Sequence, residues 1–91
     1  MIRSFRSKAL GRFWTRADPR GIKPDQRKRV LRMLRVLDEA IRLDDLKLPG
    51  YRFHALHGSP VRYSLTVTGN WRITFEWDGE DAVRVDYEDY H

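Results

Sequence analysis

Two histidines, one arginine and a short C-terminal segment carry the side chains of this sequence that are best suited to proton transfer and anion binding. His54 and His57 lie three residues apart, and an imidazole can exchange protons near neutral pH. Arg72 is a fixed cation that can hold a phosphate through two parallel hydrogen bonds. Residues 89–91, Asp-Tyr-His, add a carboxylate, a phenol and another imidazole. Together these groups supply the acid, the base and the positive charge that phosphodiester cleavage requires.

Each of these residues also has an ordinary structural explanation. Arg72 could pair with Glu76 or with an acidic residue on a neighbouring strand, and His54 could be a structural residue of a strand. Residues 89–91 could be a frayed chain end. The two histidines have no acidic or cysteine ligand at a suitable spacing beside them, so we expect no metal site. The chemical hypothesis therefore depends on the whole set of residues.

The sequence lacks the motifs of several other enzyme classes. It has no Cys, no Gly-x-Ser-x-Gly and no glycine-rich phosphate-binding loop, which argues against a covalent hydrolase or a nucleoside triphosphate enzyme. An RNase needs no protein nucleophile, because the 2′-hydroxyl of RNA can attack the adjacent phosphate. The protein then supplies a base, an acid and positive charge for the transition state. We expect no cofactor.

Positive charge is concentrated in the first part of the chain. Residues 1–35 hold 12 of the 18 Lys and Arg residues and 2 of the 13 acidic residues, so residues 36–91 are net negative. The basic part could bind a polyanion, although a solvated helix face or a surface for an acidic partner protein would have the same charge. The candidate residues for binding nucleic acid are Lys8, Arg12, Arg27, Lys28, Arg32 and Arg35.

Hydrophobic spacing predicts the elements that must position these residues. We expect a short strand at residues 1–5, a helix over residues 7–17, and a second helix that begins at Pro24, carries an apolar stripe to Ile41 and ends near Leu43. The period then changes from 3.6 to 2, which predicts strands over residues 51–56, 63–67, 71–77 and 83–87.

The order of the elements predicts an α+β fold with two N-terminal helices packed on one face of a small, mainly antiparallel β-sheet. Residues 1–91 are expected to form a single domain. In this arrangement the apolar residues of the last strands, including Val83, face the helices. Arg72, Thr74, Glu76 and Arg84 face away from them. We also expect a cytoplasmic protein that does not interact with membranes, because no apolar run reaches the length of a signal peptide or of a transmembrane helix.

Several short segments, in this order, resemble the HigB branch of the RelE/ParE toxin superfamily over nearly the whole length of the chain. The segments are residues 1–5 (Met-Ile-Arg-Ser-Phe), 37–40 (Leu-Asp-Glu-Ala), 45–46 (Asp-Leu), 49–50 (Pro-Gly), 53–58 (Phe-His-Ala-Leu-His-Gly), 70–75 (Asn-Trp-Arg-Ile-Thr-Phe) and 89–91 (Asp-Tyr-His). The resemblance implies the RelE-like microbial RNase fold, in which two helices pack on a curved antiparallel sheet. It also implies a bacterial toxin that enters the ribosomal A site and cuts mRNA. A cognate DNA-binding antitoxin (HigA-like) would neutralise the toxin.

The resemblance implies a role for each matching residue. His54 would transfer a proton, and Arg72 would hold and neutralise the scissile phosphate. Asp89, Tyr90 and His91 would complete the site with acid, base and orienting contacts, and which group is the base and which the acid stays open.

One position departs from the family pattern. His57 stands where some members have Lys, so a permanent cation is replaced by a group with fewer donors that can be neutral at pH 7. Arg62, in the variable segment that follows, could compensate. His57, Arg62 and Arg84 are the candidate substrate-binding residues.

Two alternatives to the RNase interpretation remain. In the ParE branch, toxins with a similar fold inhibit a topoisomerase (gyrase) and lack the nuclease residues. The presence of His54, Arg72 and His91 argues against this branch. The other alternative is a catalytically inactive relative that only binds its antitoxin, for which the departure at His57 is the only support in the sequence.

Overall fold

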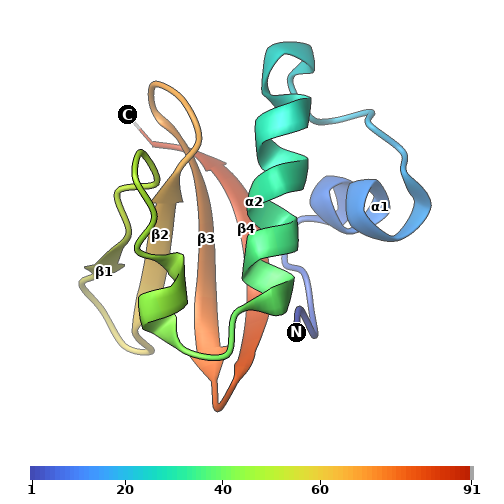
Figure 1. Cartoon of the computed structure of the whole chain (residues 1–91). Helices are drawn as coiled ribbons and strands as arrows, with labels where there is room; N and C mark the ends of the chain where they lie inside the picture. The colour runs from blue at the N-terminus through green and yellow to red at the C-terminus, as the bar shows by residue number, and fades with distance from the viewer. Residues whose placement is uncertain (91) are drawn as a thin grey trace.

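In the computed structural model, which describes residues 1–90, the helices lie on one face of a four-stranded antiparallel sheet with the strand order β1-β2-β3-β4 (Figure 1). The elements are α1 (Lys8–Arg16), the 3-10 turn η1 (Pro24–Gln26), α2 (Arg27–Glu39), the 3-10 turn η2 (Leu43–Leu46), β1 (His54–Leu56), β2 (Arg62–Thr66), β3 (Trp71–Asp78) and β4 (Asp81–Asp89). The α+β architecture expected from the sequence is confirmed. None of the helices in this part of the chain is long and apolar enough to cross a membrane.

The predicted N-terminal strand is reduced to two isolated parallel bridges, which join Ile2 to Ala82 and Phe5 to Val85. Between these bridges the backbone N–H of Arg84 donates to the Ser4 hydroxyl at 2.8 Å. Because this N–H binds a side chain, the backbone ladder along β4 is interrupted and no regular strand forms.

Helix α2 ends at Glu39, four residues earlier than predicted. The Asp45 carboxylate accepts hydrogen bonds from the backbone N–H groups of Ile41 and Arg42 at 2.9 and 3.0 Å. These bonds replace the ones that a continuing helix would have made, and they lower the pKa of Asp45. Ile41 is 59% exposed instead of completing the apolar stripe of α2.

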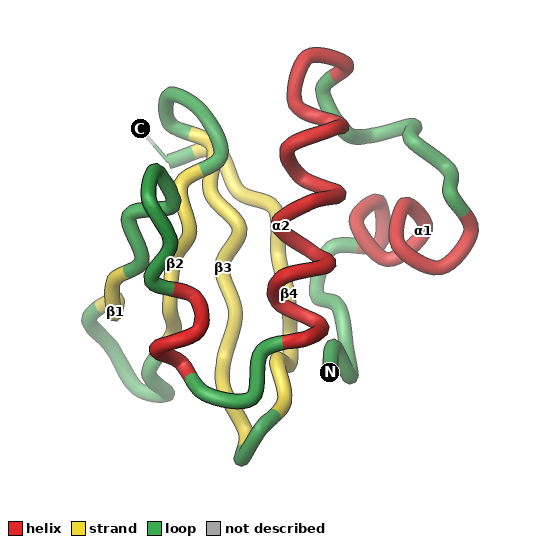
Figure 2. Tube along the Cα trace, viewed as in Figure 1, coloured by secondary structure: helices red, strands yellow, loops and turns green. Residues whose placement is uncertain are grey.

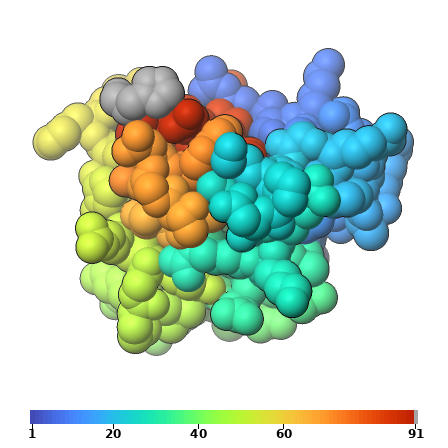
Figure 3. Space-filling view, turned by 90° about the horizontal axis from the view of Figure 1, so that it is seen from above, coloured from blue at the N-terminus to red at the C-terminus, as the bar shows by residue number. Residues whose placement is uncertain are grey.

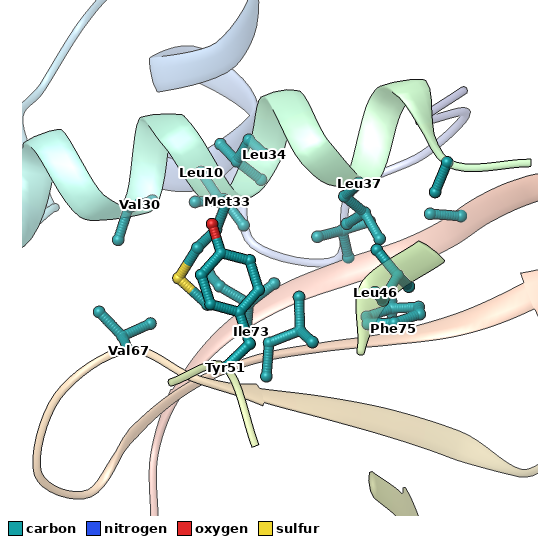
Figure 4. Packing of buried hydrophobic residues seen from close by; sticks show 14 of the residues in the cluster. Leu10, Val30, Met33, Leu34, Leu37, Leu46, Tyr51, Val67, Ile73 and Phe75 are labelled. Atoms are coloured by element: carbon teal, nitrogen blue, oxygen red, sulfur yellow. The ribbon is translucent and has the colours of Figure 1, made fainter. Parts of the chain in front are cut away.

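The core lies between α2 and the sheet, and α1 packs beside α2 (Figure 4). The largest fully buried side chains come from both helices and from β2, β3 and β4, and they include Leu10, Met33, Leu34, Leu37, Leu65, Ile73, Phe75 and Val85. Residues at helical spacing and residues at alternate strand positions both contribute to this core.

Strand β1 is shorter than predicted, because Arg52 adopts a left-handed conformation (φ 49°) before it. Tyr51, which was expected to begin the strand, is instead buried in the core, and its carbonyl accepts from the Thr66 N–H at 2.7 Å. Figure 2 shows β1 as a short segment at the edge of the sheet.

A β-bulge changes which residues of β4 face the helices. Thr74 pairs with Asp86 and Glu76 pairs with Val83, so β4 has one more residue than β3 between these pairs. Arg84 accommodates the bulge with a positive φ of 53°. The prediction for Val83 is therefore wrong. Its register with Glu76 places it on the helix-free face, and Ala82 and Val85 fill the core instead.

Arg29 fastens helix α2 to the sheet. Its Nε donates to the Val67 carbonyl at 2.6 Å, and its Nη2 donates to the carbonyls of Gly50 and Thr66 at 2.9 and 3.0 Å. The same guanidinium lies 5.2 Å from the centre of the Tyr51 ring. Arg29 thus connects the segment before β1 with the end of β2, and its planar fork suits this group of carbonyls.

Candidate active site

A row of polar residues crosses the helix-free face of the sheet. His54 pairs with Ser64, Ser64 with Thr74, and Thr74 with Asp86. Residues in register on neighbouring strands point to the same face, and strands are about 4.8 Å apart. His54 therefore stands about 10 Å from the backbone of β3, on the face that the helices leave uncovered.

A second row on the same face contains Arg72. Thr66 pairs with Arg72, and Arg72 with Glu88. The orientation predicted for Arg72 is confirmed, and the register brings it to the same face as His54, two strands away. His54 and Arg72, separated by 18 positions in the sequence, thus belong to one surface.

The Arg72 guanidinium folds toward the β2–β3 turn. Its Nη1 donates to the carbonyls of Gly69 and Trp71 at 2.6 and 3.0 Å. The alternative explanation, an ion pair with Glu76, is not observed, because Glu76 pairs with Arg84 at 3.4 Å. Among residues 1–90, Arg72 forms no ion pair and its Nε and Nη2 donate to no group, so these donors are available to an anion.

His54 is exposed, and its Nδ1 lies 3.0 Å from the Arg52 carbonyl. This distance suits a hydrogen bond in which Nδ1–H donates to the carbonyl. In that tautomer Nε2 carries no proton and can accept one, as a general base must. His57 is also exposed and directly follows β1.

The C-terminal segment is held in place as far as Tyr90. Asp89 is the last residue of β4 and pairs with Trp71, and the Tyr90 N–H donates to the Asn70 carbonyl at 2.8 Å. The explanation of a frayed end therefore does not hold for these two residues. Figure 3 shows the end of β4 (red) against the turn at 68–70 (orange). This turn also holds Arg72, whereas His91 lies outside the described residues.

Asp89 and Arg72 stand on different sides of β3 and β4. By register Asp89 shares the side of Trp71, which faces the helices. The pKa of the nearby Tyr87 is raised mainly by burial and also by the charge of Asp89. Asp89, the last residue of β4, is therefore not on the helix-free face that carries His54 and Arg72.

A buried polar network anchors this end of β4 to helix α2. Gln26 is 2% exposed, and its side chain accepts a hydrogen bond from the Tyr87 hydroxyl and donates to Thr68 Oγ1 at 3.0 Å. The Tyr87 ring stacks on Trp71 with 4.5 Å between the ring centres. The sequence analysis did not identify Gln26, since a single Gln near a helix start carries no distinctive pattern.

The other two candidate substrate-binding residues are both ion-paired on the helix-free face. Arg62 Nη2 lies 2.6 Å from Glu88 Oε2, and Thr74 donates to the same oxygen. Arg84 pairs with Glu76, as described above. A phosphate would have to compete with these carboxylates for both arginines.

Most of the candidate nucleic-acid-binding residues are exposed on the helices. Lys28, Arg32 and Arg35 follow one another at helical spacing on α2, and within residues 1–90 none of the three forms an ion pair. Lys8 and Arg12 are exposed on α1. Arg27 differs, because it is partly buried and its Nε donates to the Ile22 carbonyl at 2.9 Å.

A hollow lies away from the helix-free face, beside helix α1. It has a volume of about 360 Å³ and is lined by Arg12, Asp18, Arg20 and Gly21. Arg20 binds both carboxylate oxygens of Asp18 at 2.9 to 3.0 Å, and these bonds lower the pKa of Asp18 to about 2.

Over residues 1–90, no three His, Cys, Asp or Glu side chains form a group that could hold a metal ion.

Two N-terminal helices on one face of a four-stranded antiparallel sheet, with His54 and Arg72 on the other face, are the arrangement expected of a RelE-like toxin. Residues 3–91 match the family model of the HigB-like toxins, described as the RelE-like toxin of the type II toxin-antitoxin system HigB, and the chain belongs to this family. It is 36% identical over 92 residues to the endoribonuclease HigB of Proteus vulgaris, and the alignment covers both chains completely. The resemblance found in the sequence is confirmed.

Proposed function

We propose that this toxin is an endoribonuclease that cleaves mRNA in the ribosomal A site and thereby inhibits translation. Membership of the HigB-like family and full-length similarity to an endoribonuclease support the toxin and nuclease class. The observation that carries the proposal is the placement of His54 and Arg72 on one helix-free face. The segment that contains Asp89 and Tyr90 is bound to the turn that also holds Arg72.

The proposed reaction uses the RNA's own nucleophile. The 2′-oxygen loses its proton to a base and attacks the adjacent phosphorus, the bond from phosphorus to the 5′-oxygen breaks, and an acid protonates that oxygen. The products are a 2′,3′-cyclic phosphate and a 5′-hydroxyl. Arg72 neutralises the charge that develops on the phosphate.

His54 is one candidate for proton transfer, because its Nε2 is free to accept a proton when Nδ1 donates to Arg52. Asp89, Tyr90 and His91 are the other candidates, with acid, base or orienting roles. His57 and Arg84 would contact the flanking phosphates, whereas Arg62 is bound to Glu88.

Two surfaces would bind two kinds of RNA. The helix-free face would receive the mRNA, and the exposed residues Lys28, Arg32 and Arg35 of α2, with Lys8 and Arg12 of α1, would contact ribosomal RNA. The lack of ion partners for the α2 residues within residues 1–90 supports this role, since unpaired cations release counterions when they bind phosphates.

The family is that of toxins from type II toxin-antitoxin systems, so a cognate antitoxin is its partner. We propose that this antitoxin is a DNA-binding, HigA-like protein. Because its substrate would be mRNA on the ribosome, the toxin would act in the cytoplasm.

A reconstituted translation system tests the proposal. Wild-type protein should cut the mRNA of translating ribosomes, and a variant truncated after Glu88 should lose this activity because it lacks Asp89, Tyr90 and His91. Cleavage that survives truncation would contradict the placement of the site. A folded wild-type protein that cuts nothing would contradict the nuclease proposal, and topoisomerase inhibition would then be the next activity to measure.

A further inference from the structure

The ion pair between Arg62 and Glu88 covers the middle of the helix-free face. The row that contains Ser64 and Thr74 runs across this face. Arg62, which pairs with Leu56, lies on one side of that row, and Glu88, which pairs with Arg72, lies on the other side. The Arg62–Glu88 pair, at 2.6 Å, therefore spans the intervening row. Ser64 and Thr74 are each only 1% exposed although they stand on the face without helices.

The Arg62–Glu88 ion pair is partly shielded from solvent. The side chains of Arg62 and Glu88 are 27% and 26% exposed, whereas the Arg84–Glu76 pair on the same face leaves Arg84 67% exposed. Thr74 donates to the Glu88 oxygen that binds Arg62, and Ser64 Oγ has no hydrogen-bond partner among residues 1–90. Partial burial strengthens the attraction between opposite charges.

Glu88 has two possible arginine partners. Arg72 is directly opposite it on β3, at the distance at which cross-strand charges attract each other. In the structure, however, the Glu88 carboxylate is turned toward Arg62 and Thr74, and Arg72 binds the carbonyls of the β2–β3 turn. Arg62 thus occupies the carboxylate that would otherwise compete for Arg72.

We propose that Arg62 is a positioning residue that holds Glu88 away from Arg72 and so leaves the Arg72 guanidinium available to the RNA phosphate. This inference rests on the proposed function, because it gives Arg72 the phosphate as its ligand. A positioning role and a direct contact between Arg62 and RNA predict different results. If Arg62 only positions Glu88, its loss should not weaken RNA binding once Glu88 is replaced by a neutral residue.

A double-variant experiment separates the two roles. KM and kcat for mRNA cleavage would be measured on programmed ribosomes for wild type, Arg62→Gln, Glu88→Gln and the double variant. We expect Arg62→Gln to raise KM about fivefold, the factor that a good cross-strand ion pair is worth. The double variant, which has the net charge of the wild type, should return KM to within about twofold of the wild-type value.

Arg62→Lys and Arg3→Gln serve as controls. Arg62→Lys keeps a cation beside Glu88 and should preserve most of the affinity. Arg3 pairs with Asp81 at 3.2 Å, at the opposite end of β4 from Glu88, so Arg3→Gln removes one paired arginine without affecting Arg72. A double variant as impaired as Arg62→Gln would show that Arg62 binds RNA itself and would overturn the inference, as would an Arg62→Gln variant with unchanged KM.

A second measurement requires no RNA. In a crystal structure of Arg62→Gln, Arg72 should form an ion pair with Glu88, and Arg72 still bound to Gly69 with Glu88 turned elsewhere would overturn the inference. Thermal unfolding of each variant would confirm that it is folded. Wild type that cuts no mRNA would overturn the proposed function and with it this role of Arg62, whereas the crystal structure tests the competition for Glu88 by itself.

Discussion

The Tyr87 hydroxyl donates a hydrogen bond to the buried side chain of Gln26, a residue 61 positions earlier in the sequence. This bond joins β4 to the turn that starts helix α2. Tyr87 lies three residues before Tyr90 in the sequence. It fixes the end of β4, and with it the segment that carries Asp89 and Tyr90. This polar contact therefore contributes both to the stability of the fold and to the geometry of the candidate site.

Tyr87→Phe should lower the free energy of unfolding by about 1–3 kcal/mol, because it leaves the buried Gln26 oxygen without its donor. Chemical denaturation would measure the loss. Tyr63→Phe is a suitable control, since no hydrogen bond of the Tyr63 hydroxyl is seen within residues 1–90. Equal stability of Tyr87→Phe and wild type would contradict the importance of the bond.

The same bond predicts a pH dependence. Burial raises the pKa of Tyr87 above its ordinary value of 10.0, so the folded state keeps the phenolic proton at a pH where the unfolded state releases it. The stability from Tyr87 is complete below pH 10 and is lost as the pH rises through the folded pKa. The difference in unfolding free energy between wild type and Tyr87→Phe should therefore shrink above pH 10, and a constant difference would contradict this expectation.

Asp18 predicts a dependence at the acid end. Hydrogen bonds from the Arg20 side chain and backbone lower the pKa of Asp18 from 3.8 to about 2. Its contribution is present above pH 3.8 and is lost as the pH falls through about 2. The stability difference between wild type and Asp18→Asn, measured by denaturation from pH 5 to pH 2, should decrease with falling pH. A difference that does not change over this interval would contradict the assignment.

Arg29 should be important for stability. Arg29→Ala removes the donor of three carbonyl groups and should lower the free energy of unfolding by about 2–4 kcal/mol. Arg29→Lys should recover only part of this loss, because an ammonium group lacks the planar fork of the guanidinium. Arg32→Ala, an exposed neighbour on α2, is the control. A full recovery by Lys would mean that charge alone matters at this position.

His57→Lys should increase the rate of mRNA cleavage. A permanent cation at position 57, directly after β1, would strengthen phosphate binding by up to about fivefold, the usual range for one exposed charge pair. The gain should be lost at high salt, which screens exposed charges. Cleavage kinetics of the variant and wild type at two salt concentrations would measure this, and an unchanged rate at low salt would remove position 57 from substrate binding.

Periodic features of the sequence were good predictors of the fold. Val30, Leu34 and Leu37 recur at helical spacing, and all three are completely buried. Alternation along β3 correctly placed Arg72 on the face opposite Ile73. Such patterns are predictive because they reflect repeated contact with a single core.

Single interactions ended or shifted these patterns and could not be predicted. Nothing in the apolar stripe indicates that Asp45 would bind the backbone of Ile41 and stop α2 at Glu39. Strand alternation likewise does not reveal the bulge at Arg84, which moved Val83 to the other face.

For the candidate site, the sequence indicated residue types and faces but not partners. It placed Arg72 on the helix-free face, yet the actual contacts of this residue with Gly69 and Trp71 depend on the shape of the β2–β3 turn. The pairing of Arg62 with Glu88 joins residues 26 positions apart and has no local signature.

The most direct test of the account is mRNA cleavage by wild type and Arg72→Ala, each with and without ribosomes. Wild type should cut mRNA only on ribosomes, and Arg72→Ala should lose about 2–4 kcal/mol of transition-state stabilisation, a fall in rate of about thirtyfold to a thousandfold. Arg72→Lys should lie between the two. Equal cleavage by wild type and Arg72→Ala, or wild-type cleavage of free mRNA at the ribosomal rate, would contradict the account.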